Sequence, residues 1–174
     1  MDRCSQCGFV YEDLPQSSIT GALVEVARQY GPRLRGADPA ALRRRPAPEV
    51  WSALEYTAHV RDVLRVQRER VLLALADDQP RFESMRREER VVELTYNRMD
   101  PAAVDAELQE AARSLASLFA GLSDTEWRRT GVYTWPSVAS RDLRWMGRHT
   151  THELVHHLFD IVRAVEPTPG SASG

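Results

Sequence analysis

Residues 149–160 of the chain read HTTHELVHHLFD and contain four of its five histidines. Positions three and four apart in an α-helix lie on the same face. A helix here would therefore present one polar stripe, made of His149, His152, Glu153, His156 and Asp160. The opposite face would hold the apolar residues of the segment, namely Leu143, Val155, Leu158, Ile161 and Val162. The pattern predicts an amphipathic helix over about residues 140–165.

His152 and His156 lie one turn apart, so both imidazoles can reach one metal ion. Alone, such a pair also fits a solvated polar face, or histidines that bond to neighbouring carbonyls. The fifth histidine, His59, lies midway along another predicted helix, and bundles build metal sites from inward side chains on facing helices. The sequence thus predicts one divalent ion held by His59, His152 and His156, with coordination positions left for water or substrate.

The remaining apolar periodicity predicts three more helices, over about residues 17–30, 49–75 and 100–122. Asp100-Pro101 is a strong helix start, and Gly31-Pro32 should end or kink the first helix. The only short strand-like stretch is 90–96. These features favour an all-α fold, a four-helix bundle, over residues 15–166. Residues 1–14 form a separate N-terminal knuckle in this division, and residues 167–174 a disordered tail.

The composition excludes several functions. The 174 residues carry a formal charge of −2, which gives no field that would recruit nucleic acid or an acidic membrane. All basic residues are arginine, so lysine Schiff-base chemistry and phosphate-loop lysines are excluded. No signal peptide or membrane-spanning stretch is visible, and two cysteines make no secreted disulfide framework. We expect a cytoplasmic protein whose partner is a small-molecule substrate.

Cys4 and Cys7, followed by Gly8, resemble one knuckle of a zinc ribbon, which lacks two of the four ligands. The same pair in a second subunit could complete a four-cysteine site, which would predict a homodimer. Alternatively the pair borrows a side chain such as His149 or His157, or it is a redox or vestigial thiol pair. A structural role ranks above a catalytic one.

Carboxylates flank the predicted ligands at helical spacing. Glu55 and Asp62 could orient the ring of His59, and Glu153 and Asp160 could do so on the last helix. For Glu55 and Asp62, an ordinary pair with one of the many arginines is the better interpretation. The arginine-rich loop 81–98 could fold over the metal and bind an anion, with Tyr96 and Asn97 at its end as candidate contacts.

Three motifs carry a resemblance to a known family: WSxxExxxH at 51–59, WRRTG at 127–131 and RWMGRHTTHELVHHLFDI at 144–161. Over about residues 15–165 the chain resembles the DinB/YfiT-like superfamily. The narrower resemblance is to its actinobacterial branch, which includes the N-terminal domain of mycothiol-dependent maleylpyruvate isomerase. The resemblance implies a four-helix bundle with zinc or nickel, held at the positions of His59, His152 and His156. Some thiol transferases of the family have Glu at the first position of the pair, where this chain has His152.

The resemblance also implies S-transfer or isomerisation with a low-molecular-weight thiol such as mycothiol, bacillithiol or glutathione. A three-ligand ion would lower the pKa of a bound thiol, and it would activate a bound water in the same way. We therefore expect a metal-dependent thiol S-transferase, isomerase or hydrolase. The alternative is a metal-binding or stress-response protein without turnover, and the sequence identifies no catalytic residue.

Overall fold

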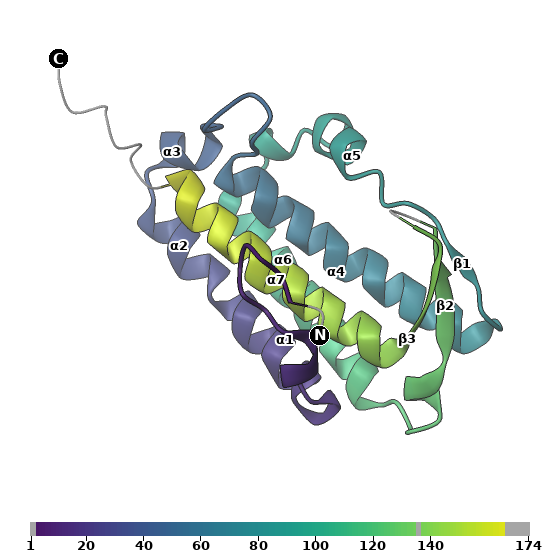
Figure 1. Cartoon of the computed structure of the whole chain (residues 1–174). Coiled ribbons are helices and arrows are strands. Elements are labelled where there is room, and N and C mark those ends of the chain that lie inside the picture. The colour runs from purple at the N-terminus through teal and green to yellow at the C-terminus, as the bar shows by residue number, and fades with distance from the viewer. Residues whose placement is uncertain (1–2, 135–136, 166–174) are drawn as a thin grey trace, which may run out of the picture.

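Four long helices form the body of the molecule (Figure 1). The computed structural model describes residues 3–134 and 137–165. The helices are α1 (Ile19–Arg28), α4 (Ala53–Ala76), α6 (Pro101–Ala120) and α7 (Leu143–Val165). α4 and α1 each pack against both α6 and α7, which gives the closed arrangement of a bundle. The predicted all-α four-helix bundle is confirmed. The predicted tail, 167–174, lies outside the described residues.

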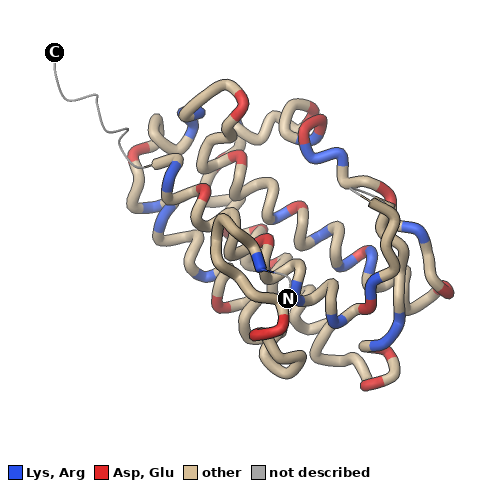
Figure 2. Tube along the Cα trace, viewed as in Figure 1, with Lys and Arg blue, Asp and Glu red and all other residues tan. Residues whose placement is uncertain are grey.

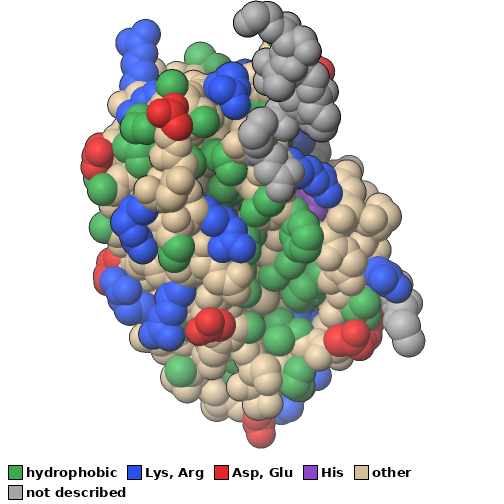
Figure 3. All heavy atoms as spheres, turned by 90° about the vertical axis from the view of Figure 1, so that its left-hand side faces the viewer, with side chains coloured by type: hydrophobic (Ala, Val, Ile, Leu, Met, Phe, Trp, Pro, Cys, Tyr) green, Lys and Arg blue, Asp and Glu red, His purple; other side chains and the backbone are tan. Residues whose placement is uncertain are grey.

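The core fills the space between these helices. Its largest fully buried side chains are Tyr30, Tyr96, Phe119, Ile19, Leu23, Leu54, Leu64, Leu108, Leu115, Leu143, Met146 and Leu154. Among the described residues, no helix is long and apolar enough to span a bilayer. Basic and acidic residues are interspersed along the chain in Figure 2, and the face in Figure 3 carries both beside hydrophobic side chains.

Side-chain caps explain where two of the long helices begin. The Ser52 hydroxyl accepts a hydrogen bond from the Glu55 N–H, and the Glu55 carboxylate accepts one from the Ser52 N–H. This capping box contributes about 1 kcal/mol and starts α4 a few residues later than predicted. The Asp100 side chain accepts a hydrogen bond from the Ala103 N–H, and Pro101 follows as the first residue of the helix. The predicted start of α6 is therefore confirmed.

The first predicted helix is divided into two. α1 ends at Arg28, α2 (Tyr30–Gly36) follows directly after Gln29, and α3 (Pro39–Arg43) comes next. Gly31 and Pro32 lie in the first turn of α2, where a proline removes no helical hydrogen bond. The helix is therefore interrupted at Gln29, two residues before the dipeptide at which an end or a kink was predicted.

A small sheet, which the sequence analysis does not anticipate, covers one end of the bundle (Figure 1). β2 (Thr130–Tyr133) pairs in parallel with β1 (Arg81–Phe82) and antiparallel with β3 (Ala139–Asp142). A Cβ at Gly131 would collide with the Phe82 ring, so only glycine permits this close approach of β1 and β2. The strand-like stretch 90–96 belongs instead largely to α5 (Arg87–Glu93) and to η3 (Tyr96–Arg98), and η4 (Glu126–Arg128) precedes β2.

The N-terminal segment, residues 3–18, runs against α7 through η1 (Tyr11–Asp13) and η2 (Gln16–Ser18). Arg148 donates to the Leu14 carbonyl at 2.8 Å, and Arg144 donates to the Gln16 side chain at 2.9 Å. None of residues 3–18 is buried. These polar contacts, together with the partly buried Leu14 and the rings of Phe9 and Tyr11 against α7, hold the segment in place.

Candidate metal centres

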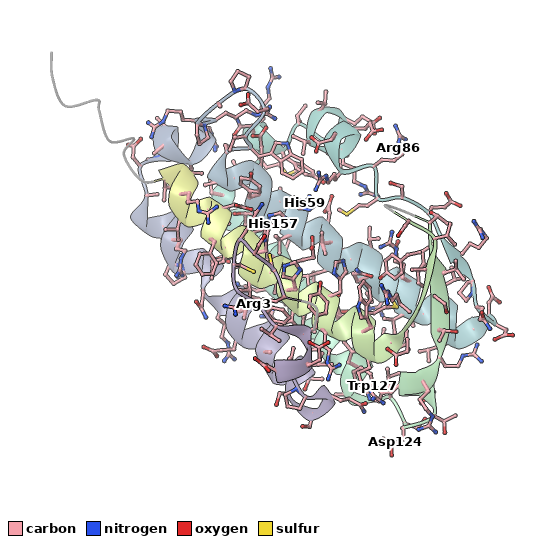
Figure 4. All side chains as sticks on the ribbon, viewed as in Figure 1. Arg3, His59, Arg86, Asp124, Trp127 and His157 are labelled. Carbon is pink, nitrogen blue, oxygen red and sulfur yellow. The ribbon has the colours of Figure 1, made fainter. Side chains whose placement is uncertain are left out.

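His59 of α4 meets two residues of α7 in the interior of the bundle. One ligand atom from each of His59, Glu153 and His157 lies within 4.8 Å of those of the other two. His59 is 3% exposed and His157 is 7% exposed, and their ring centroids are 5.0 Å apart. Figure 4 shows the two labelled histidines side by side, on their respective helices. We call this group the inner centre.

Asp160 orients the buried imidazole of the inner centre. Its Oδ2 lies 2.9 Å from Nδ1 of His157, and the other ring nitrogen, Nε2, lies 3.7 Å from Oε2 of Glu153. Nδ1 of His59 is buried without a hydrogen-bond partner. The predicted orienting role of Asp160 thus applies to His157, and Glu153 lies among the ligand groups instead of behind them.

The charges of the inner centre follow from burial and from these contacts. Burial, together with the nearby His157 charge, lowers the pKa of His59 to about 3, so its imidazole is neutral. Burial opposes charge on His157 as well, but hydrogen bonds with Asp160 and Glu153 outweigh it and raise its pKa to about 9. For Glu153, burial is outweighed by the hydrogen bond with His157, which holds the pKa of the carboxyl well below its usual value.

The structure divides the predicted triad of His59, His152 and His156. His157, not His156, faces α4, because the buried side of α7 runs through Leu154 and Ile161. Of the predicted core face, Leu143, Leu158 and Ile161 are buried, whereas Val155 and Val162 are only half-buried and Leu154 joins the core. His152 and His156 lie on the side of α7 that carries the N-terminal segment.

His152 and His156 meet the two cysteines of that segment. One ligand atom from each of Cys4, Cys7, His152 and His156 lies within 4.8 Å of those of the other three. Sγ of Cys4 is 3.6 Å from Nδ1 of His156. We call this group the outer centre. The structure thus brings His152 and His156 to the cysteine pair, where the sequence analysis named His149 or His157 as the side chain to be borrowed.

A cavity of about 650 Å³ adjoins the inner centre, with His59 and Glu153 in its wall. The rest of the lining comes from α4, from β1 and the loop after it, from the start of α5, from the two longer strands and the residues beside them, and from the start of α7. Tyr11 comes from the N-terminal segment. Arg70 lies 5.1 Å from the Tyr133 ring, and Arg141 lies 4.8 Å from the Trp145 ring. These two arginines place positive charge in the cavity wall, where each guanidinium group packs on an aromatic ring.

The sequence analysis missed Arg70, Tyr133 and Arg141 as cavity residues, because two of them lie on strands too short to predict. The WRRTG motif at 127–131, which leads into β2, was the available signal. In the predicted arginine loop, Arg86 lines the cavity, yet it is largely exposed and pairs with Glu93 at 3.2 Å (Figure 4).

Three other predicted contacts lie away from the inner centre. Glu55 caps α4 and receives two hydrogen bonds from Arg45, which bears out the ordinary ion pair as its role. Tyr96 donates to Asp62 at 2.5 Å within the core. Asn97 donates to the Arg43 carbonyl and contacts Ser52. All three stabilise the start of α4 and its neighbours, and none lines the cavity.

Comparisons with known proteins agree with this architecture. A family model described as the DinB superfamily matches residues 22–161. YfiT from Bacillus subtilis, described as a probable metal-dependent hydrolase with an unusual four-helix bundle topology, superposes with a TM-score of 0.78 at 18% identity, covering 86% of this chain and 85% of YfiT. The mycothiol-dependent maleylpyruvate isomerase superposes with a TM-score of 0.68 at 15% identity, covering 90% of this chain and 70% of that one. No curated protein matches the sequence significantly. At these identities the structural likeness shows the fold.

Proposed function

Because the chain belongs to the DinB superfamily, we propose that it is a metal-dependent enzyme acting on a small anionic molecule, with a divalent ion held by His59, Glu153 and His157. The observation that carries the proposal is the inner centre itself: two buried imidazoles and one half-buried carboxylate from two facing helices, beside a cavity of substrate size. This proposal replaces the predicted pair His152 and His156 by Glu153 and His157.

The residues of the inner centre fit a divalent ion. Two imidazoles and one carboxylate are a ligand set of catalytic zinc sites, and three protein ligands leave a position open. The buried, unpartnered Nδ1 of His59 is a polar atom whose burial costs free energy unless something binds it. The carboxylates of Glu153 and Asp160 supply negative charge that a cation would balance. Zinc or nickel is the expected metal.

Residues around the inner centre would orient its ligands and bind the substrate. A bound ion would supply a lowered pKa for a coordinated thiol or water. Asp160 fixes the tautomer and the orientation of the His157 ring. Arg70 and Arg141 line the cavity and would bind the carboxylate or similar anion of a substrate. Their stacking on Tyr133 and Trp145 limits their rotamers, so less entropy is lost on binding.

A low-molecular-weight thiol of the mycothiol type is the nucleophile that we propose first, which makes the reaction S-transfer or isomerisation. The size of the cavity supports this choice, since attack by water would require less room. Hydrolysis is the second candidate, supported by the same open position. A metal-binding protein without turnover is the remaining alternative.

Cobalt substitution tests the open position. The Cys4→Ser/Cys7→Ser variant is used, so that no protein thiolate contributes to the spectrum. If a thiol cofactor binds the inner ion, added thiol should produce a sulfur-to-cobalt charge-transfer band, and His59→Ala in the same background should abolish it. A response to azide and carboxylates but not to thiols would favour hydrolysis. A spectrum that ignores all three ligands would mean a closed centre and would refute the enzyme proposal.

A further inference from the structure

The outer centre combines two structures from opposite ends of the chain. Cys4 and Cys7 lie in a tight turn in which the Gly8 N–H donates to the Cys4 carbonyl and the Cys4 N–H donates to the Phe9 carbonyl, both at 2.9 Å. Gly8 has a φ of +76°, which a residue with a Cβ adopts only with strain. An antiparallel bridge between Arg3 and Val10 closes the turn. The backbone thus presents both sulfurs to the same side.

The two histidines face this turn from α7. Tetrahedral zinc, with bonds of about 2.0–2.3 Å, places its ligand atoms roughly 3.3–3.8 Å from one another. The 3.6 Å between Sγ of Cys4 and Nδ1 of His156 falls in that interval. One ligand atom from each of the four side chains lies within 4.8 Å of those of the other three, so small side-chain adjustments would close the set around one ion.

The outward nitrogens of both histidines have partners suited to a metal ligand. The Tyr11 hydroxyl lies 3.1 Å from Nδ1 of His152, and Nε2 of His152 is buried without a hydrogen-bond partner. Nε2 of His156 lies 3.6 Å from the Asp160 carboxylate, on the far side of the ring from Cys4. Each ring therefore has one nitrogen oriented by an oxygen, as ligating histidines commonly do, while Nδ1 of His156 faces Cys4 and Nε2 of His152 has no partner in the protein.

Side-chain contacts fasten the segment to α7 only in part. No residue from 3 to 18 is buried, although Leu14 packs against the core and the rings of Phe9 and Tyr11 contact rings of α7. Small substructures without a core are commonly held by metal ions or disulfides. Tyr11, which lines the cavity, belongs to this segment, so whatever fastens the segment also sets one part of the cavity wall.

We propose that Cys4, Cys7, His152 and His156 bind one structural zinc ion within a single chain, and that this ion fastens the N-terminal segment to α7 beside the inner centre. The site is separate from the one on which the proposed function rests. All four coordination positions are filled by protein, which is the closed arrangement of structural rather than catalytic zinc. The turn needs no second subunit, because α7 supplies both missing ligands.

Native mass spectrometry of the full chain with zinc tests the site. The wild-type chain should hold two ions, and the Cys4→Ser/Cys7→Ser variant should hold one. A matched control, Ser5→Ala/Gln6→Ala, alters exposed residues of the same turn and should keep two. Retention of both ions by the double cysteine variant would overturn the proposal, as would a wild-type chain that binds a single ion and loses it in His59→Ala/His157→Ala.

X-ray absorption separates the outer ion from the inner one. In the His59→Ala/His157→Ala variant the remaining zinc should show two sulfur and two nitrogen neighbours, whether or not the inner centre has any activity. Four sulfur neighbours with half an ion per chain would instead establish a cysteine bridge between two subunits, and would refute the intrachain site. The double cysteine variant should also be cleaved faster by protease within residues 3–18.

Discussion

The inner and outer centres differ although they are built from adjacent residues of one helix. Glu153 and His157 point into the bundle toward His59, whereas His152 and His156 point outward to Cys4 and Cys7. One step along a helix rotates a side chain by about 100°, which suffices to assign neighbouring histidines to different centres. The inner group has three ligand groups and adjoins the cavity, whereas the outer has four, none of which lines that cavity. Ligand count, burial and residue type all separate the two proposed roles, since the inner group is His-Glu-His and the outer group has two cysteines and two histidines.

The largest effect is expected from the matched pair His157→Ala and His156→Ala. His157→Ala should weaken the inner ion by more than about 100-fold, because loss of a ligand exceeds the usual effect of losing an orienting partner. His156→Ala should leave the inner ion in place and weaken only the outer one. Competition with a chromophoric chelator measures both affinities. Equal losses at both centres in either variant would show that the two are one site.

Asp160→Asn should have the next largest effect. The Asp160 carboxylate lies 2.9 Å from His157 and 3.6 Å from His156, so it supports the inner centre more directly. Inner affinity should fall about 10–100-fold and outer affinity less. The same chelator titration on Cys4→Ser/Cys7→Ser and His59→Ala backgrounds separates the two values. A greater loss at the outer centre would contradict the assignment of Asp160 to His157.

Arg141→Gln should weaken anion binding in the cavity beside the inner centre and leave the outer centre unchanged. Removal of one charged hydrogen-bond donor from the cavity should weaken the binding of a small carboxylate such as succinate to the cobalt-loaded protein by about 10-fold. Arg144→Gln is the control, because Arg144 bonds to Gln16 and does not line the cavity. Identical carboxylate affinity in the two variants would place the anion elsewhere.

The smallest effect is expected from Tyr11→Phe. Its hydroxyl contacts the His149 ring at 2.9 Å and the His152 ring at 3.1 Å, and the ring itself stays in place in the variant. Outer affinity should fall about 10-fold or less, and inner affinity should not change. Isothermal titration with zinc in the His59→Ala background measures the outer value. An unchanged outer affinity would mean that Tyr11 does not orient His152.

The bundle was predictable because its signals are local. Asp100-Pro101 and the apolar periodicity of the long helices predict them directly, whatever their neighbours. The sheet depends on the contact of Gly131 with Phe82, which are 49 positions apart in a pair of strands too short to show a pattern. The sequence alone therefore favours loops there, and it misses the cavity wall that these strands supply.

The register of the proposed metal ligands was not predictable for a different reason. The segment 152–157 contains histidines at positions that suit either face, and apolar residues such as Leu154 and Val155 lie between them. Only the packing of α7 against α4 decides which face is buried. His59, in contrast, is a lone histidine in an apolar seam, and its placement in the interior was predicted. The partners of Cys4 lie about 150 positions away, beyond any local pattern.

That separation has a consequence for folding. Cys4 and His156 are 152 positions apart in the chain, so an ion shared by them would close a loop of nearly the whole polypeptide. In the chain-entropy model, such a closure lowers the conformational entropy of the unfolded ensemble. The folded state is thereby stabilised by about 5 kcal/mol. The contact is also among the least local in the molecule, and it cannot form before α7 has been synthesised. The ion would link the first and last parts of the chain after the rest of the protein has folded.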